Sequence, residues 1–312
     1  MIEMLTLEEF GEAVETVISE ELGILYDVKL MKVIKNNNRC LLGLCIRCVG
    51  SNIAPTIYLN DYYREYEEEE DFTGIVKDIL QVYRNSNKGL PVVKDDFTWE
   101  GIKKNVILRL INYDKNEELL QGVPHKRVYE DLAITFHVLV GSDKEGVQTY
   151  RINNELFCSF NIEIDVLYDT ALHNSMTYFP TSLRNINEMI VSMIAPEGVD
   201  NEEYAELFDT TVPEEGRGIM YVLSNSIGVY GATAMLYPDM IKEFADTMGA
   251  DLYILPSSLH EVILVLDYGC SYRGFELQRM VVDVNRTVLQ SEDILSDNVY
   301  KYYRATNKIE KL

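Results

Sequence analysis

The sequence is short of basic residues. Of its 312 residues, 28 are lysine or arginine and 51 are aspartate or glutamate, so the formal net charge is −23. A surface of this charge repels phosphate groups, which argues against direct binding to nucleic acids or to anionic membranes. It is compatible with a basic protein partner, although an acidic surface also serves simply to keep a protein soluble.

Long hydrophobic runs are missing as well. No stretch approaches the ~18 consecutive apolar residues of a transmembrane helix. The N-terminal sequence MIEMLTLEEFGEAV is acidic and lacks the basic flank and small-residue cleavage site of a secretory signal. The five cysteines form an odd number, which favours free thiols in a reducing compartment. We therefore expect a cytoplasmic protein.

Motifs of the familiar enzyme and cofactor classes are also absent. The sequence has no G-x-S-x-G elbow, no H-E-x-x-H zinc motif, no P-loop lysine and no G-x-G-x-x-G fingerprint. His125, His137 and His173 are scattered along the chain, and we interpret His137, which lies inside an apolar strand, as a buried sheet residue. These absences predict neither a metal site nor an intrinsic cofactor.

One cysteine spacing needs separate treatment. Cys40, Cys45 and Cys48 match part of a plant-type iron–sulfur pattern, but a cluster needs a fourth cysteine and a loop around the metal. The three cysteines lie instead in an apolar strand. Because cysteine is among the most buried residue types, we expect structural thiols here.

The sequence does contain clear helical patterns. Apolar residues at helical spacing over 7–21 predict a helix, and Thr6 followed by Glu9 is a capping-box pattern at its start. The character of the chain changes around Pro124. We therefore predict an N-terminal α+β region, 1–122, and a C-terminal α+β region, 123–312.

Strand patterns occur mainly as hairpins. Alternating apolar residues flank polar turns over 26–48 and again over 131–153, and 251–267 shows two apolar runs around a short turn. Strand–helix–strand units are less frequent. We predict an α+β fold, in which mixed, mostly antiparallel sheets are built from hairpins and packed with helices.

The turn inside DLYILPSSLHEVILVLD, residues 251–267, carries the residue types of a hydrolase. In an extended chain Ser258 and His260 share a face, whereas Glu261 points away, so a triad is not preformed. A Pro-Ser-Ser turn whose hydroxyls bond their own backbone explains the same residues. A ligand-binding loop and a catalytic serine at Ser257 or Ser258 stay open.

A second polar segment ends the strand MYVLSN and leads through SIGVYG into a helical pattern. Backbone N–H groups at such a position can cradle an anion, but the surrounding charge is negative, and a glycine-supported bend is the simpler interpretation. Both segments form a ligand site if they meet in one concavity. The predicted binding residues are then Ser224, Asn225, Gly228, Tyr230, Gly231, Ser257, Ser258 and His260.

These segments resemble a known family. The strand MYVLSN, the tripeptide LYP at 236–238 and ILPSSLHE at 254–261 resemble the signature of uncharacterised bacterial proteins common in anaerobic gut Firmicutes. More distantly, the hairpin beginning at Asp131 and the later ALHN at 171–174 are similar to the YtpQ-like uncharacterised proteins. Neither resemblance implies an established activity, cofactor or catalytic residue.

The charges are unevenly distributed. Residues 191–270 contain 14 acidic and 2 basic residues, and the segment 191–215 is the expected acidic interaction face. Near the central hairpin the basic residues are Arg109, Lys126, Arg127 and Arg151, and we expect each of them to pair with a nearby carboxylate.

Three functional hypotheses follow. The first is a non-enzymatic binding or regulatory protein whose acidic face receives a basic protein partner. The second is a hydrolase or transferase centred on Ser257, Ser258 and His260. The third is an acidic mimic of nucleic acid carried by a mobile element, which would bind an enzyme that normally binds DNA or RNA.

Overall fold

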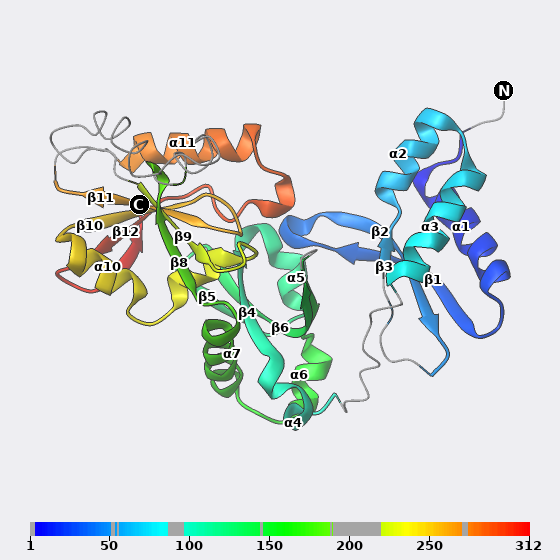
Figure 1. Cartoon of the computed structure of the whole chain (residues 1–312), viewed down its shortest axis with the longest axis horizontal. Coiled ribbons are helices and arrows are strands. Elements are labelled where there is room, and N and C mark those ends of the chain that lie inside the picture. Colours follow the sequence, from blue (N-terminus) through cyan, green and yellow to red (C-terminus); the bar gives the residue numbers. More distant parts are fainter. Residues whose placement is uncertain are drawn as a thin grey trace, which may run out of the picture. The chain divides into compact units, whose positions relative to one another are not determined.

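The computed structural model describes residues 4–50, 54, 56–86, 97–143, 146–187, 189, 220–269 and 274–312 (Figure 1). The chain forms two compact units, Met1–Asp96 and Phe97–Leu312. The sequence predicts a division after residue 122. The structure places it near residue 96, because strand β4 (Val106–Asn112) pairs along its whole length with β6 (Leu132–Asp143) of the second unit.

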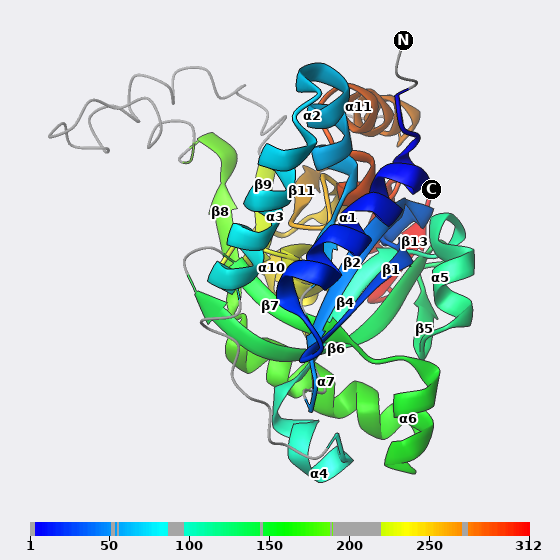
Figure 2. The same ribbon diagram turned by 90° about the vertical axis from the view of Figure 1, so that its right-hand side faces the viewer.

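The first unit combines a three-stranded antiparallel sheet with α-helices. Its elements are α1 (Leu7–Leu22), β1 (Tyr26–Ile34), β2 (Cys40–Cys48), β3 (Thr56–Tyr58), α2 (Asn60–Glu69) and α3 (Phe72–Ser86). The predicted hairpin over 26–48 is confirmed, and Figure 2 shows α1 lying along it. The predicted capping box is present too, since the Thr6 hydroxyl accepts from the Glu9 amide and the Glu9 carboxylate from the Thr6 amide.

Phe10 is the centre of the first unit's core. Its side chain is fully buried, and its ring lies 5.6, 5.2 and 5.8 Å from the rings of Tyr63, Tyr66 and Phe72. Aromatic rings at these separations add to the stabilisation that burial provides. The contacts join α1, α2 and the start of α3, so the acidic side chains of α1 and α2 are left on the solvent side.

The second unit contains two antiparallel sheets. The first sheet consists of β4, β5 (His125–Val128), β6 and β7 (Gly146–Arg151), and it is accompanied by α4 (Trp99–Ile102), α5 (Glu117–Gln121), α6 (Asn154–Phe160) and α7 (Ile164–Tyr178). Strand β6 is central: β4 pairs with one edge, and β5 and β7 pair with successive halves of the other.

The second sheet has the strand order β13-β12-β10-β11-β9-β8. Its elements are β8 (Thr181–Asn185), β9 (Met220–Asn225), the 3-10 helix η4 (Gly231–Leu236), α10 (Met240–Met248), β10 (Asp251–Pro256), β11 (Val262–Asp267), α11 (Gly274–Thr287), η5 (Ser291–Asp293), β12 (Tyr300–Tyr303) and β13 (Lys308–Lys311). Helices α11 and α10 lie on opposite faces of this sheet (Figure 1). Leu277 of α11 packs with Tyr253 and Val265, whereas Phe244 of α10 contacts Tyr221.

The predicted α+β fold is confirmed. All the strand pairs in the described residues are antiparallel, and β1–β2, β6–β7 and β10–β11 are the three hairpins expected from the sequence. No helix in the described part of the chain combines the length and the apolar composition needed to cross a membrane.

Asp131 connects the two sheets of the second unit. It is 2% exposed and precedes β6, and its carboxylate accepts hydrogen bonds from Ser296 Oγ (2.6 Å), Asn298 Nδ2 (2.9 Å) and Tyr300 OH (2.8 Å). Burial and the nearby Asp131 charge raise the pKa of Tyr300, so its hydroxyl stays protonated and donates. A buried carboxylate is tolerated only when such donors surround it.

Two tyrosines of β12 test this connection. We expect Tyr300→Phe to lower the free energy of unfolding by about 2 kcal/mol, since it removes a hydrogen bond to a charged group. Tyr302→Phe is the control, because this residue is similarly buried but its part-buried hydroxyl donates to the neutral Asn307 amide oxygen, and loss of that bond costs about 1 kcal/mol. Urea unfolding of the three proteins gives both values. Equal losses for the two variants would contradict a special role for Asp131.

Candidate functional site

The two predicted polar segments meet. Strand β9 pairs with β11 so that Leu223 lies opposite Val262, which places the end of β9 beside the β10–β11 turn. The Ser224 hydroxyl donates to the His260 carbonyl (2.7 Å), and the Ala232 amide donates to the Leu259 carbonyl (3.2 Å). We call this contact between residues 224–232 and 257–261 the turn junction.

Asn225 shapes the first half of the turn junction. Its side-chain oxygen accepts from the Ile227 and Gly228 amides, and its Nδ2 donates to the Val229 carbonyl at 2.8 Å. Gly228 takes a φ of +77°, and Tyr230 takes a left-handed conformation with φ 53°. The loop is thus closed on itself by one side chain, as asparagine commonly does in turns.

Gly231 lets the two segments approach closely. A Cβ atom built on this residue would lie 2.5 Å from the His260 carbonyl oxygen and 2.7 Å from the Asn225 amide nitrogen, and it would overlap the Ser224 hydroxyl. Two of these three neighbours are backbone atoms, which cannot move aside cheaply. A glycine is therefore required here for packing, which differs from the anion cradle considered from the sequence.

The His260 imidazole is held from both sides. Its Nδ1 accepts from the Tyr230 amide at 3.1 Å, which leaves the proton of the neutral ring on Nε2. Nε2 lies 3.5 Å from the Asp293 carboxylate, and the ring lies 5.6 Å from that of Tyr230. Because Nδ1 already accepts the hydrogen bond from the Tyr230 amide, it is not free to act as a base in this structure.

The serine hydroxyls are used within the turn itself. Ser258 Oγ accepts from the His260 amide at 2.9 Å, and Ser257 Oγ donates to the Glu261 carboxylate at 3.3 Å. Neither hydroxyl forms a hydrogen bond with the His260 ring among the described contacts. A nucleophilic serine needs such a bond to a base, so the turn has the residue types of a hydrolase without their arrangement.

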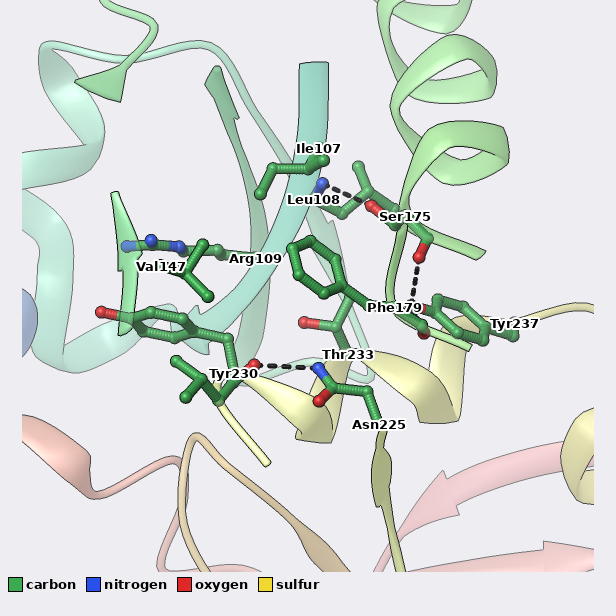
Figure 3. Close-up of a pocket in the computed structure, with 11 residues that line it drawn as sticks. Ile107, Leu108, Arg109, Val147, Ser175, Phe179, Asn225, Tyr230, Thr233 and Tyr237 are labelled. Atoms are coloured by element: carbon green, nitrogen blue, oxygen red, sulfur yellow. Dashed lines mark hydrogen bonds between the residues drawn. The ribbon is translucent and has the colours of Figure 1, made fainter. Parts of the chain in front are cut away.

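A narrow cavity lies beside the turn junction, between β4 and residues 225–237 (Figure 3). It has room for about one water molecule, ≈ 10 Å³. Of the predicted site residues, Asn225 and Tyr230 line it. The cavity is also lined by Arg109, Val147, Phe179, Val229 and Thr233.

Hydrogen bonds fix the wall of the cavity opposite Tyr230. The Leu108 amide donates to Ser175 Oγ of α7 at 2.9 Å, and the Tyr237 hydroxyl lies 3.1 Å from both the Ser175 and the Phe179 carbonyls (Figure 3). These bonds join β4, the end of α7 and Tyr237, the residue that follows η4. The cavity is therefore surrounded by three elements that are tied to one another.

Arg109 is the charged group of this cavity. Its guanidinium stacks 3.6 Å above the Tyr230 ring, and Nη2 donates to Thr149 Oγ1 at 2.6 Å. Burial lowers the pKa of Arg109 to about 10, and the charge of Arg151 acts in the same direction while Tyr230 opposes it. Arg109 nonetheless stays charged at neutral pH.

The expectation that Arg109 pairs with a carboxylate was wrong. Lys126 pairs with Asp165 at 2.8 Å and Arg127 with Asp114 at 3.7 Å, as predicted. No carboxylate in the described residues forms an ion pair with Arg109, because the side chain turns from β4 toward the cavity and not toward solvent. The only sequence signal was a charged residue inside the apolar strand VILRLIN.

The amino-acid sequence matches a known protein family. The sequence of residues 7–304 matches a family of unknown function, DUF5688. The chain belongs to the DUF5688 family. No curated protein and no solved structure matches it.

The structure also tests the predictions for His137 and for the cysteines of this DUF5688 chain. His137 is buried as expected, with Nε2 3.2 Å from Thr135 Oγ1, and burial lowers its pKa well below the usual range. The expectation of buried thiols was wrong for Cys40 and Cys48, which are exposed because they lie at the two ends of β2. The described residues contain no group of three or more His, Cys, Asp or Glu that could hold a metal ion.

The acidic segment 191–215 lies outside the described residues. Asp293 and Thr233 were not anticipated from the sequence. Asp293 is more than thirty positions from His260, and nothing in its local sequence indicates that contact.

The turn junction can be tested at its two glycines. Gly231→Ala is expected to lower the free energy of unfolding by about 3 kcal/mol, because the added methyl overlaps backbone atoms. Gly228→Ala is the control, because there is open space around the new methyl. Its free energy of unfolding should fall only by the cost of placing alanine in the left-handed conformation, about 1 kcal/mol. Chemical denaturation compares the two. A smaller loss for Gly231→Ala than for Gly228→Ala would show that the junction is not closely packed.

Proposed function

We propose that this DUF5688 protein is a non-enzymatic binding protein of the bacterial cytoplasm, whose acidic surface receives a basic protein partner. The observation that supports a non-enzymatic role is that both ring nitrogens of His260 already have partners. Its Nδ1 accepts from the Tyr230 amide and Nε2 faces Asp293, so neither serine has a histidine base, and among the described residues the Ser257 hydroxyl bonds only to the Glu261 carboxylate.

The acidic surface has a described component in the first unit. Helices α1 and α2 pack together, and their solvent sides carry nearly all acidic charges. We call the following residues the acidic helix pair: Glu8, Glu9, Glu12, Glu20 and Glu21 of α1, with Asp61, Glu65, Glu67, Glu68 and Glu69 of α2. The segment 191–215 is proposed to contribute further negative charge to partner binding.

The position of these charges supports an interaction role over solubility alone. Neither helix has a basic residue in its last turn, where Glu20 and Glu21 of α1 and Glu67–Glu69 of α2 stand instead. Negative charge at a helix C-terminus opposes the helix dipole and costs about 0.3–1 kcal/mol per charge at low salt. Acidic residues elsewhere on the surface would give solubility without this cost.

Charge reversal on the acidic helix pair is expected to change the stability of the protein and its binding of a partner in opposite directions. The double variant Glu20→Lys/Glu68→Lys is expected to be slightly more stable, by about 0.5 kcal/mol, since lysine at a helix C-terminus is favourable. It should also recover less of a basic partner in pull-downs from bacterial lysate, with the wild-type interaction declining as salt is raised. Unfolding curves and quantitative mass spectrometry measure the two effects.

The control for this test is Asp283→Lys/Glu310→Lys. It makes the same change in net charge at exposed positions of the second unit. Equal loss of a partner with both double variants would indicate a nonspecific charge effect, and unchanged recovery with the first would remove the acidic helix pair from the proposal. Reversal of the acidic residues of 197–215 tests the contribution of that segment in the same way.

A fluorophosphonate probe tests the rival hydrolase. We expect no labelling of the wild-type protein, because a serine without a histidine base and an oxyanion hole is too weak a nucleophile to react. The comparison includes Ser257→Ala and Ser258→Ala. Labelling of the wild type that disappears in either variant would establish a reactive serine at the turn and contradict the non-enzymatic proposal.

A further inference from the structure

Three exposed apolar side chains lie together at one end of the first unit. Ile24 is 96% exposed, and Leu25 and Val49 are each 65% exposed. The Val49 amide donates to the Leu25 carbonyl at 2.9 Å, which places the end of β2 beside the turn that follows α1. We call these three residues the apolar tip. Single exposed apolar residues are common on soluble proteins, whereas neighbouring ones mark an interaction site.

The exposure of the apolar tip is fixed by the fold. Gly23 ends α1 with a φ of 72°, and its amide donates to the Ser19 carbonyl at 3.0 Å. The Tyr26 amide donates to the Gly23 carbonyl at 3.1 Å, and the Tyr26 ring lies 6.1 Å from that of Tyr83. The turn between α1 and β1 is thus closed by backbone bonds and anchored to α3. A surface that is already ordered loses less entropy when a partner binds.

Negative charge borders the apolar tip. Glu20 and Glu21 of the acidic helix pair lie in the last turn of α1, just before Gly23. Glu21 lies 4.0 Å from Arg84, but both side chains are more than half exposed, and such a surface ion pair contributes little to stability. Val17 is 39% exposed and precedes these glutamates by three and four positions, so it shares their helix face. Apolar and acidic side chains therefore lie side by side at this end of α1.

We propose that the basic partner docks on the apolar tip through an amphipathic segment. Its apolar side chains cover Ile24, Leu25 and Val49, and its lysines or arginines face Glu20 and Glu21. Apolar contacts at the centre of an interface, with charged groups at the rim, are the usual arrangement in protein complexes. This docking mode rests on the proposed function, and it adds where the partner binds and what kind of surface the partner presents.

The charges favour this partner over the other surfaces that could cover the apolar tip. Glu20 and Glu21 repel an anionic membrane, since charges of the same sign oppose its approach. A second copy related by two-fold symmetry brings the same glutamates of both chains together, which is also unfavourable. A basic segment is attracted by the glutamates, and its apolar side chains remove the tip from water.

Two synthetic helical peptides test this docking on the full-length chain. The first carries leucines along one face and lysines along the other, and the second has glutamine in place of every leucine. In fluorescence anisotropy at physiological salt, the wild type is expected to bind the leucine peptide about tenfold more tightly, because only that peptide buries the apolar tip. Ile24→Ser/Leu25→Ser should abolish this difference, while its binding of the glutamine peptide stays like that of the wild type.

The matched control is Val166→Ser/Met176→Ser, which removes two exposed apolar side chains from α7 of the second unit. It should bind both peptides like the wild type, and circular dichroism verifies that each variant is folded. A preference for the leucine peptide that survives in Ile24→Ser/Leu25→Ser would overturn docking at the apolar tip without affecting the proposed function. Failure of the wild type to bind either peptide would instead contradict the proposed function itself.

Two further measurements decide between the occupants of the apolar tip. Flotation of the wild type with neutral phosphatidylcholine vesicles that is lost in Ile24→Ser/Leu25→Ser would assign the tip to a membrane. A wild-type dimer that the same substitutions convert to a monomer in sedimentation velocity would assign it to a second copy. Either result would overturn the proposed partner, whereas a monomer that does not bind the vesicles supports it.

Discussion

The buried Asp131 carboxylate is the constraint on which the second unit depends. An ionised carboxylate out of water costs several kcal/mol unless donors replace its hydration. Here all three side-chain donors come from a single segment, Ser296 to Tyr300, which lies 165 to 169 residues later in the chain. The first sheet can bury this charge only when the segment leading into β12 docks against it. The carboxylate thus fixes how the two sheets of the unit meet.

That docking is what creates the Arg109 cavity. One wall comes from β4 of the first sheet, and the other comes from residues that follow β9 of the second. The Arg109 guanidinium stacks on the Tyr230 ring, and the Tyr230 amide donates a hydrogen bond to His260 Nδ1. The conspicuous serines and histidine of the β10–β11 turn therefore act on the cavity indirectly, as the support that orients Tyr230.

Local patterns made the hairpins and capping box predictable, because strand alternation, turn residues and cap residues are short-range properties. The meeting of Ser224 with His260 could be suspected from the sequence, but only the pairing of β9 with β11 establishes it. The unit boundary was missed because β4 lies before residue 122 but pairs with β6, which lies after it. The expected ion pair of Arg109 is missing from the described residues for a similar reason: whether a carboxylate reaches a cation is decided by tertiary packing and leaves no trace in composition.

A buried, charged Arg109 is physically consistent with a net charge of −23. Surface charges beyond the Debye length of ~8 Å are largely screened at physiological salt. By contrast, two unit charges ~4 Å apart in a medium of dielectric constant ~20 interact by about 4 kcal/mol. The nearest cation therefore dominates the potential inside the cavity, while the acidic surface governs what approaches from outside. Arg109 therefore keeps a positive local potential although the chain as a whole is strongly acidic.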